Sequence, residues 1–135
     1  MTKISLVTGG AGFIGSNLVD YLLEQGHSVI CLDNESANNE KFYWPLEDGR
    51  AISIKADVTD YKAMKNVFTG VDYVFHLAAE SRLQSAIQNP IQAVEKNCVG
   101  TTVMLQCARE AGVKRFIYSS TSSGYGNNPC PNVET

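Results

Sequence analysis

The sequence contains few of the residues that build metal centres or disulfide frameworks. Its 135 residues include 2 histidines and 4 cysteines, and no two cysteines form a C-x-x-C pair. Cys31, Cys98 and Cys107 lie in apolar periodic segments, and this placement is typical of small buried thiols in a reducing compartment. We therefore expect neither a disulfide nor a metal site.

Long hydrophobic runs and an excess of charge are also absent. No apolar run could span a bilayer, and the run in MTKISLVTGG is too short for a signal peptide. The net charge is −3 and the basic residues are scattered, which argues against a nucleic-acid surface. These properties predict one cytoplasmic domain with no membrane or nucleic-acid partner.

Short apolar segments alternate with segments of helical period along the chain. Strands are predicted at 3–8, 28–32, 51–56, 71–77 and 114–119, and helices at 14–25, 60–68 and 90–112. Strands of this kind belong to a parallel sheet that is covered on both faces. Right-handed crossovers then predict a doubly wound α/β fold with strand order 3-2-1-4-5. The polar segment 34–50 is expected to form a loop with at most a short helix.

The longest predicted helix has recognisable ends. Asn89 and Pro90 suit its N-terminus, and Gly112 suits its C-terminus. Its spacing predicts the following buried face: Val94, Cys98, Thr101, Leu105 and Ala108.

A glycine triplet lies between the first predicted strand and the first predicted helix. Gly9, Gly12 and Gly15 have the spacing G-x-x-G-x-x-G. The first glycine suits a tight turn, the second lets a pyrophosphate approach the backbone, and the third lets the helix pack close to the sheet. The free N–H groups at the helix N-terminus would face the phosphates.

An aspartate ends the second predicted strand. Asp33 lies 18 residues beyond Gly15, near the offset at which a carboxylate accepts the hydroxyls of an adenosine ribose. It would repel a 2′-phosphate, and no Lys or Arg occurs in the six residues after it, so the sequence favours NAD over NADP. The alternative is a glycine turn with a surface aspartate.

Further motifs carry a family resemblance. The chain contains TGGAGFIGSNL at 8–18, LDN at 32–34, ADVTD at 56–60, HLAA at 76–79, N-x-x-G-T at 97–101 and VKRFIYSS at 113–120. In this order they resemble the N-terminal half of the extended short-chain dehydrogenase/reductase family. The nearest kind is its NAD-dependent nucleotide-sugar epimerases and dehydratases, UDP-glucose 4-epimerase among them. The resemblance covers essentially the whole chain and implies a Rossmann-type fold.

The resemblance implies a role for each matching position. The pyrophosphate would lie on Gly9, Gly12, Phe13, Ile14 and Gly15. The adenosine ribose would lie on Asp33 and Asn34, and the adenine by Asp57 and Val58. The rest of the cofactor would run along Leu77, Ala78 and Ala79, with the nicotinamide ribose near Ser119 and Ser120. Asn97 would brace the loop after the fourth strand, and Thr121 would hydrogen-bond the sugar hydroxyl that is oxidised. Asp57 could instead be a plain helix cap, and residues 119–123 a polar loop.

The family's catalytic Tyr-x-x-x-Lys pair has no counterpart at the matching place. By resemblance it would fall beyond Thr135. The pair Tyr61–Lys65 follows the third strand on the adenine side, where this spacing usually marks a solvated helix face. We expect residues 1–126 to be an incomplete NAD-binding domain, truncated before the catalytic helix and substrate domain. Residues 127–135 are expected to be a poorly anchored tail.

The resulting hypothesis is the NAD-binding portion of a nucleotide-sugar epimerase or dehydratase, inactive as this chain alone. The alternatives are a non-catalytic NAD(H)-binding module or partner-completed subunit, and a decayed remnant. The parent enzyme would use a nucleotide sugar. Self-association is expected through the 90–112 helix or an exposed sheet face. Glu80-Ser81-Arg82 is closer to dehydratases than to epimerases, so the reaction subclass is open.

Overall fold

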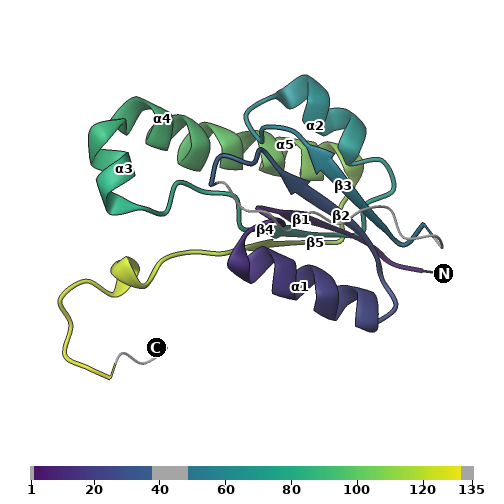
Figure 1. Cartoon of the computed structure of the whole chain (residues 1–135), viewed down its shortest axis with the longest axis horizontal. Coiled ribbons are helices and arrows are strands. Elements are labelled where there is room, and N and C mark those ends of the chain that lie inside the picture. The colour runs from purple at the N-terminus through teal and green to yellow at the C-terminus, as the bar shows by residue number, and fades with distance from the viewer. Residues whose placement is uncertain (1, 38–48, 132–135) are drawn as a thin grey trace.

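The structure is a computed structural model, and it describes residues 2–37 and 49–131. Five parallel strands form a sheet between two layers of helices (Figure 1). The strands are β1 (Ile4–Thr8), β2 (Ser28–Asp33), β3 (Ala51–Lys55), β4 (Tyr73–His76) and β5 (Arg115–Tyr118). Most of the segment expected to be a loop, 34–50, lies outside the described residues.

The helices lie in two groups. They are α1 (Phe13–Glu24), α2 (Tyr61–Val67), α3 (Leu83–Gln88), α4 (Pro90–Val94), a π-helical turn (Glu95–Gly100), α5 (Thr101–Ala111) and a short 3₁₀ turn (Ser122–Tyr125). α1 covers one face of the sheet, whereas α2 and α5 pack together on the other (Figure 1). α3 and α4 extend beyond the carboxyl ends of the strands.

The sheet has the predicted order, β3-β2-β1-β4-β5, and all four pairings are parallel. Successive residues of a strand face opposite sides, so β1 contributes to two cores. Leu6 packs with Met64, Phe68 and Met104 on the α2–α5 side, while Val7 packs against α1 on the other. The prediction of a doubly wound α/β fold is confirmed, with strand bounds within about two residues.

The predicted helix over 90–112 is present as a continuous helical segment over 90–111, but it is not α-helical throughout. A π-helical turn separates α4 from α5, and α3 precedes them as an additional, unpredicted helix. The π-helical turn fits closely against the end of β3, because a Cβ on Gly100 would lie 2.6 Å from a methyl group of Val58. Gly112 ends α5 in the left-handed conformation, at φ 68°, as predicted.

The buried face predicted for this helical segment, however, is largely wrong. Val94 and Leu105 are 56% and 49% exposed, Cys98 is exposed and Thr101 is half-buried, and of the five only Ala108 is buried. The residues that face the core are instead Ala93, Gly100, Met104, Cys107 and Ala108. Small residues let the helix pack close to the sheet, while its larger aliphatic side chains face outward.

The cysteines differ in exposure. Cys31 and Cys107 are buried, but Cys98 and Cys130 are exposed, so the expectation of buried thiols is wrong for Cys98. Within the described ranges, no three His, Cys, Asp or Glu side chains come together in a group that could hold a metal ion.

The segment after β5 leaves the body of the molecule. Residues 119–131 are exposed, and Figure 1 shows them extending away from the sheet. Their regular structure is limited to the turn over Ser122–Tyr125. The side chain of Thr121 caps this turn by accepting a hydrogen bond from the N–H of Ser123 at 3.2 Å.

Candidate functional site

A cavity of about 610 Å³ lies at the carboxyl ends of the strands. In a doubly wound sheet this edge is where ligands bind, since the crossovers diverge there. Segments from the ends of all five strands, the N-terminus of α1 and the π-helical turn contribute to its wall. Its lining residues are Gly9, Gly12, Phe13, Ile14, Gly15, Leu32, Asp33, Asn34, Ser36, Ala37, Ala56, Val58, Leu77, Ala78, Ala79, Ser81, Arg82, Lys96, Ser119 and Ser120.

The glycine loop has no room for side chains at two of its glycines. Gly9 turns the chain out of β1 at φ 67°, a conformation that favours glycine. A Cβ on Gly15 would lie 2.1 Å from the carbonyl oxygen of Gly9. The loop is therefore folded tightly against the first turn of α1, as its spacing predicted.

The N-terminus of α1 opens toward the cavity. Gly12 occupies the cap position, so no side chain caps the helix, and its first turn contains no acidic residue. Phe13 and Ile14 line the cavity and are 85% and 66% exposed. The first N–H groups of a helix carry partial positive charge, so this end suits an anionic group.

Asp33 joins the glycine loop to the end of β2. Its Oδ2 accepts a hydrogen bond from the N–H of Ala11 at 3.1 Å, and its Oδ1 accepts one from the N–H of Glu35 at 2.8 Å. A carboxylate has about four acceptor positions, so each oxygen can still accept a hydrogen bond from a ligand. The same side chain thus fixes the loop and presents an acceptor to the cavity.

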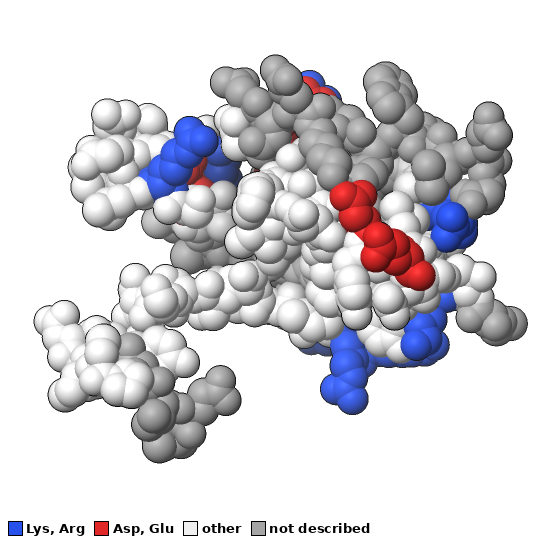
Figure 2. All heavy atoms as spheres, turned by 60° about the horizontal axis from the view of Figure 1, so that its bottom comes forward, with Lys and Arg blue, Asp and Glu red and all other residues white. Residues whose placement is uncertain are grey.

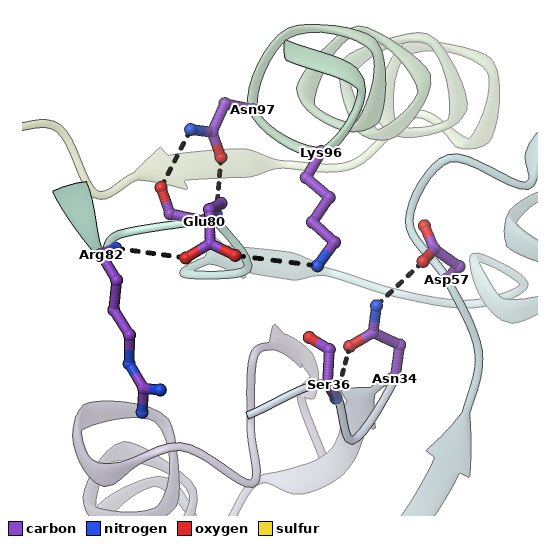
Figure 3. Close-up of polar contacts among 7 residues, drawn as sticks. All are labelled: Asn34, Ser36, Asp57, Glu80, Arg82, Lys96 and Asn97. Atoms are coloured by element: carbon purple, nitrogen blue, oxygen red, sulfur yellow. Dashed lines mark hydrogen bonds and ion pairs between the residues drawn. The ribbon is translucent and has the colours of Figure 1, made fainter. Parts of the chain in front are cut away.

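Asp57 makes its hydrogen bonds within the protein. Its Oδ1 accepts from the N–H and hydroxyl of Thr59, and its Oδ2 accepts from the amide of Asn34 at 2.9 Å (Figure 3). Burial raises the pKa of Asp57, but these hydrogen bonds and the positive charge of Lys96 outweigh burial and hold the pKa below its usual value. The cap of α2 is Asp60, which accepts from the N–H of Ala63.

A buried histidine supports the loop after β4. The hydroxyl of Thr101 donates to the carbonyl of Asn97, so it must accept from Nε2–H of His76. Nδ1 then accepts from the hydroxyl of Thr8, whose oxygen accepts the N–H groups of Leu77 and Ala78, both at 3.1 Å. This network fixes the tautomer of the ring and the backbone that lines the cavity.

The imidazole of His76 is neutral in this network. Its side chain is 1% exposed, and burial lowers its pKa from 6.5 to about 4. A second ring proton would meet the hydroxyl hydrogen of Thr8. His76 therefore acts as a neutral structural residue, not as an acid or base.

The next part of this loop is bound to the π-helical turn. The side-chain amide of Asn97 accepts from the N–H of Glu80 at 2.7 Å and donates to its carbonyl at 3.1 Å (Figure 3). The Glu80 carboxylate lies 3.9 Å from the ammonium of Lys96 and accepts from the N–H of Arg82 at 3.2 Å. Figure 2 shows basic and acidic side chains together beside the lobe of α3 and α4, with mostly uncharged surface around them.

The cavity wall contains most, but not all, of the residues predicted for the site. Asp57, Asn97 and Thr121 do not line it. Asp57 binds the lining residue Asn34, Asn97 binds the backbone of Glu80 between the lining residues Ala79 and Ser81, and Thr121 caps the 3₁₀ turn. The lining residues missed by the predicted set include Ser36, Arg82 and Lys96. No motif marks Lys96, because it comes from a helix far along the chain.

The pair Tyr61–Lys65 lies on α2, outside the cavity wall. The hydroxyl of Tyr61 donates to Oε2 of Glu110 at 2.7 Å. This hydrogen bond to a carboxylate raises the pKa of Tyr61, in the direction opposite to what a tyrosine base requires.

Comparison with known proteins identifies relatives of this fold and cavity. Residues 5–135 match the model of the NAD dependent epimerase/dehydratase family. The UDP-glucose 4-epimerase of Halalkalibacterium halodurans is 38% identical over 90% of this chain and 35% of its own length. The UDP-N-acetyl-alpha-D-glucosaminuronate decarboxylase of Bacillus cytotoxicus is 37% identical over 97% of this chain and 40% of its own length.

A solved structure shows the same similarity. The UDP-glucose-4-epimerase of Stenotrophomonas maltophila, with bound NAD and formylated UDP-arabinopyranose, superimposes with a TM-score of 0.86 at 30% identity. This chain is covered completely, but it spans only 42% of that structure's chain. The chain belongs to the NAD dependent epimerase/dehydratase family. It spans 35–42% of the length of these three relatives.

Proposed function

We propose that the chain binds NAD in the cavity, as the cofactor-binding portion of a nucleotide-sugar epimerase or dehydratase. The observation that carries this proposal is the meeting of three features at one cavity: the glycine loop, the uncapped N-terminus of α1, and Asp33. The pyrophosphate would lie on the loop and the adenosine ribose against Asp33. The first N–H groups of α1 would meet the pyrophosphate, because Gly12 leaves this helix end without a side-chain cap.

The adenine end would lie between the ends of β2 and β3. Val58 and Asn34 line the cavity there, and Asp57 lies directly behind Asn34. An amino group on the ligand could share the Asp57 carboxylate with Asn34, since Oδ2 has a second acceptor position. Leu77, Ala78 and Ala79 would run along the cofactor, and Ser119 would approach the nicotinamide ribose.

Bound NAD would supply a hydride acceptor for a sugar hydroxyl. Thr121 is the residue proposed to hydrogen-bond that hydroxyl. A base would also be needed, and Tyr61, whose pKa is raised, is unsuited to it. We therefore expect this chain alone to bind NAD without epimerising or dehydrating a nucleotide sugar. Epimerase turnover by the purified 135-residue chain would contradict this expectation.

A subunit completed by a different partner is a second candidate, and self-association is a separate proposal. The exposed aliphatic side chains on α3, α4 and α5, which we call the outer stripe, favour contact with a second copy of this chain. They are Leu83, Ile87, Ile91, Val94 and Leu105. Ile117 of β5 is also 41% exposed, so part of the sheet face lacks cover. Apolar surface of this kind favours association.

The proposed location is the cytoplasm. Within the described residues, no helix is long and apolar enough to cross a membrane.

Calorimetric titration with NAD and NADP tests the proposed cofactor. We expect saturable NAD binding and a weaker response to NADP, because the Asp33 carboxylate repels a 2′-phosphate. Asp33→Asn keeps a similar shape but removes the charge. The ratio of the affinity for NAD to that for NADP should therefore fall about tenfold. Glu24→Gln makes the same charge change at an exposed position of α1 and should leave the preference unchanged. No binding of NAD by the folded chain would refute the proposal.

A further inference from the structure

The ammonium of Lys96 is unusually enclosed for a lysine. Its side chain is only 15% exposed and lines the cavity, extending from the π-helical turn toward the space between Glu80 and Asn34 (Figure 3). Its ion pair with Glu80 has an N–O distance of 3.9 Å, whereas a charge-assisted hydrogen bond measures about 2.8 Å. Across residues 2–37 and 49–131, no hydrogen bond from Nζ accompanies this ion pair.

The geometry of the π-helical turn explains why Lys96 faces the cavity. The turn is wider than an α-helical one, so the consecutive residues Lys96 and Asn97 can both face the loop after β4. Asn97 holds the backbone of Glu80 through two hydrogen bonds, and Arg82 holds its carboxylate through the backbone. The carboxylate is thus fixed, and the flexible lysine is the partner that can move.

The charges around the cavity leave a role for this cation. The loop over 8–15 contains no basic side chain. Three carboxylates, of Asp33, Asp57 and Glu80, lie in or beside the cavity. Lys96 faces two of them, because its charge also lowers the pKa of Asp57. Removing an ammonium from water costs free energy unless an anion pairs with it at close range. A single ion pair at 3.9 Å offsets this cost poorly.

We propose that Lys96 binds the adenosine-side phosphate of the dinucleotide. Its ammonium would exchange the ion pair with Glu80 for one with this phosphate. The proposal rests on the proposed function and adds a contact to it. The phosphate would lie between the N-terminus of α1 and the lysine, which approach it from opposite walls of the cavity. Lysine suits this role because it meets phosphate as a compact charge with three donors. The adenosine side is chosen because Lys96 faces Asn34 and Asp57, at the ends of β2 and β3.

Adenosine and two of its monophosphates separate the possible contacts. Adenosine has no phosphate, 5′-AMP carries the proposed one, and 2′-AMP carries a phosphate on the other side of the ribose. In Lys96→Met we expect the affinities for 5′-AMP and NAD to fall about tenfold, and the affinity for adenosine to stay unchanged. Lys96→Arg should restore part of the loss. Lys62→Met makes the same change on the exposed face of α2 and should bind as the unaltered chain does.

A second measurement needs no variant. The side-chain NMR signals of Lys96 should shift when 5′-AMP is added to the unaltered chain, and should not shift with adenosine. The proposal is overturned if Lys96→Met lowers the affinity for adenosine as much as that for 5′-AMP, or if it lowers only the affinity for 2′-AMP. It is also overturned if the Lys96 signals do not shift when 5′-AMP is added. An unaltered chain that binds neither NAD nor 5′-AMP would overturn the proposed function itself. A chain that binds NAD with Lys96→Met as tightly as before would overturn only the role of Lys96.

Discussion

The side-chain amide of Asn97 binds both backbone groups of Glu80, accepting from the N–H at 2.7 Å and donating to the carbonyl at 3.1 Å. Few side chains can do this, because only a carboxamide has an acceptor and a donor side by side. The contact fixes the loop after β4 to the π-helical turn. It therefore holds one wall of the cavity at a set distance from the glycine loop.

Asn97→Asp tests this contact. The aspartate keeps an acceptor for the N–H of Glu80 but loses the donor for its carbonyl, and it adds charge beside the Glu80 carboxylate. We expect the free energy of unfolding in urea to fall by about 1–3 kcal/mol, and NAD affinity to fall with it. Asn66→Asp, on the exposed side of α2, is the matched control. Equal effects of the two substitutions would show that the contact is unimportant.

Gly15→Ala should deform the glycine loop. The added methyl group would lie 2.1 Å from the carbonyl oxygen of Gly9, and backbone must move to accommodate it. We expect the free energy of unfolding to fall by about 1–3 kcal/mol. We also expect calorimetry to detect no NAD binding by this variant. Gly124→Ala adds the same methyl group where nothing lies within 4 Å, and it should be neutral. Unchanged NAD binding by Gly15→Ala would contradict the packing described for the loop.

Stability should fall as His76 gains a proton. Its folded-state pKa, about 4, lies below the ordinary value of 6.5, so its contribution is complete above pH 6.5 and is lost as the pH falls toward 4. The shift corresponds to about 3 kcal/mol in all. Urea unfolding in a His27→Gln background isolates this imidazole, and ¹⁵N NMR of the ring should show the Nε2–H tautomer. An Nδ1–H tautomer, or stability that rises over this pH range, would disprove the network.

Ile91→Glu should weaken self-association. Ile91 is 76% exposed within the outer stripe, and a charge there would have to be buried in any contact made through it. We expect light scattering after size exclusion to show a dimer for the unaltered chain and a monomer for the variant. Tyr21→Glu, on an exposed part of α1, should not change the mass. If Tyr21→Glu alone gives monomers, the contact lies on the other face of the sheet.

The strands and the glycine loop could be predicted because their signals are local. Apolar runs ending in glycine or aspartate mark both the strand and its functional end, as Thr8–Gly9 and Leu32–Asp33 show. The π-helical turn could not be predicted in this way, since its residues have no distinctive pattern. Without it, the outward-facing Val94 and Leu105 were assigned to the core.

The position of Lys96 in the cavity wall could not be predicted, for a different reason. Its enclosure depends on contacts between segments far apart in the chain, and lysine is normally a surface residue. Asp57 is not the cap of α2, which is Asp60, and its place beside the adenine stays a prediction. It binds Thr59 in a local turn, as a capping residue would, and it also holds Asn34 at the cavity.

The hydrogen-bonded series Thr8–His76–Thr101 has a further consequence for how the molecule opens. It connects β1, β4 and α5 through two buried side chains and the half-buried Thr101, so separating any of these elements breaks this series. Their amide hydrogens should exchange with solvent together, in one cooperative event close to global unfolding. α3 has no buried residue and should exchange far sooner. One wall of the cavity would then belong to the slowest-exchanging part of the protein, and the neighbouring lobe to one of the fastest.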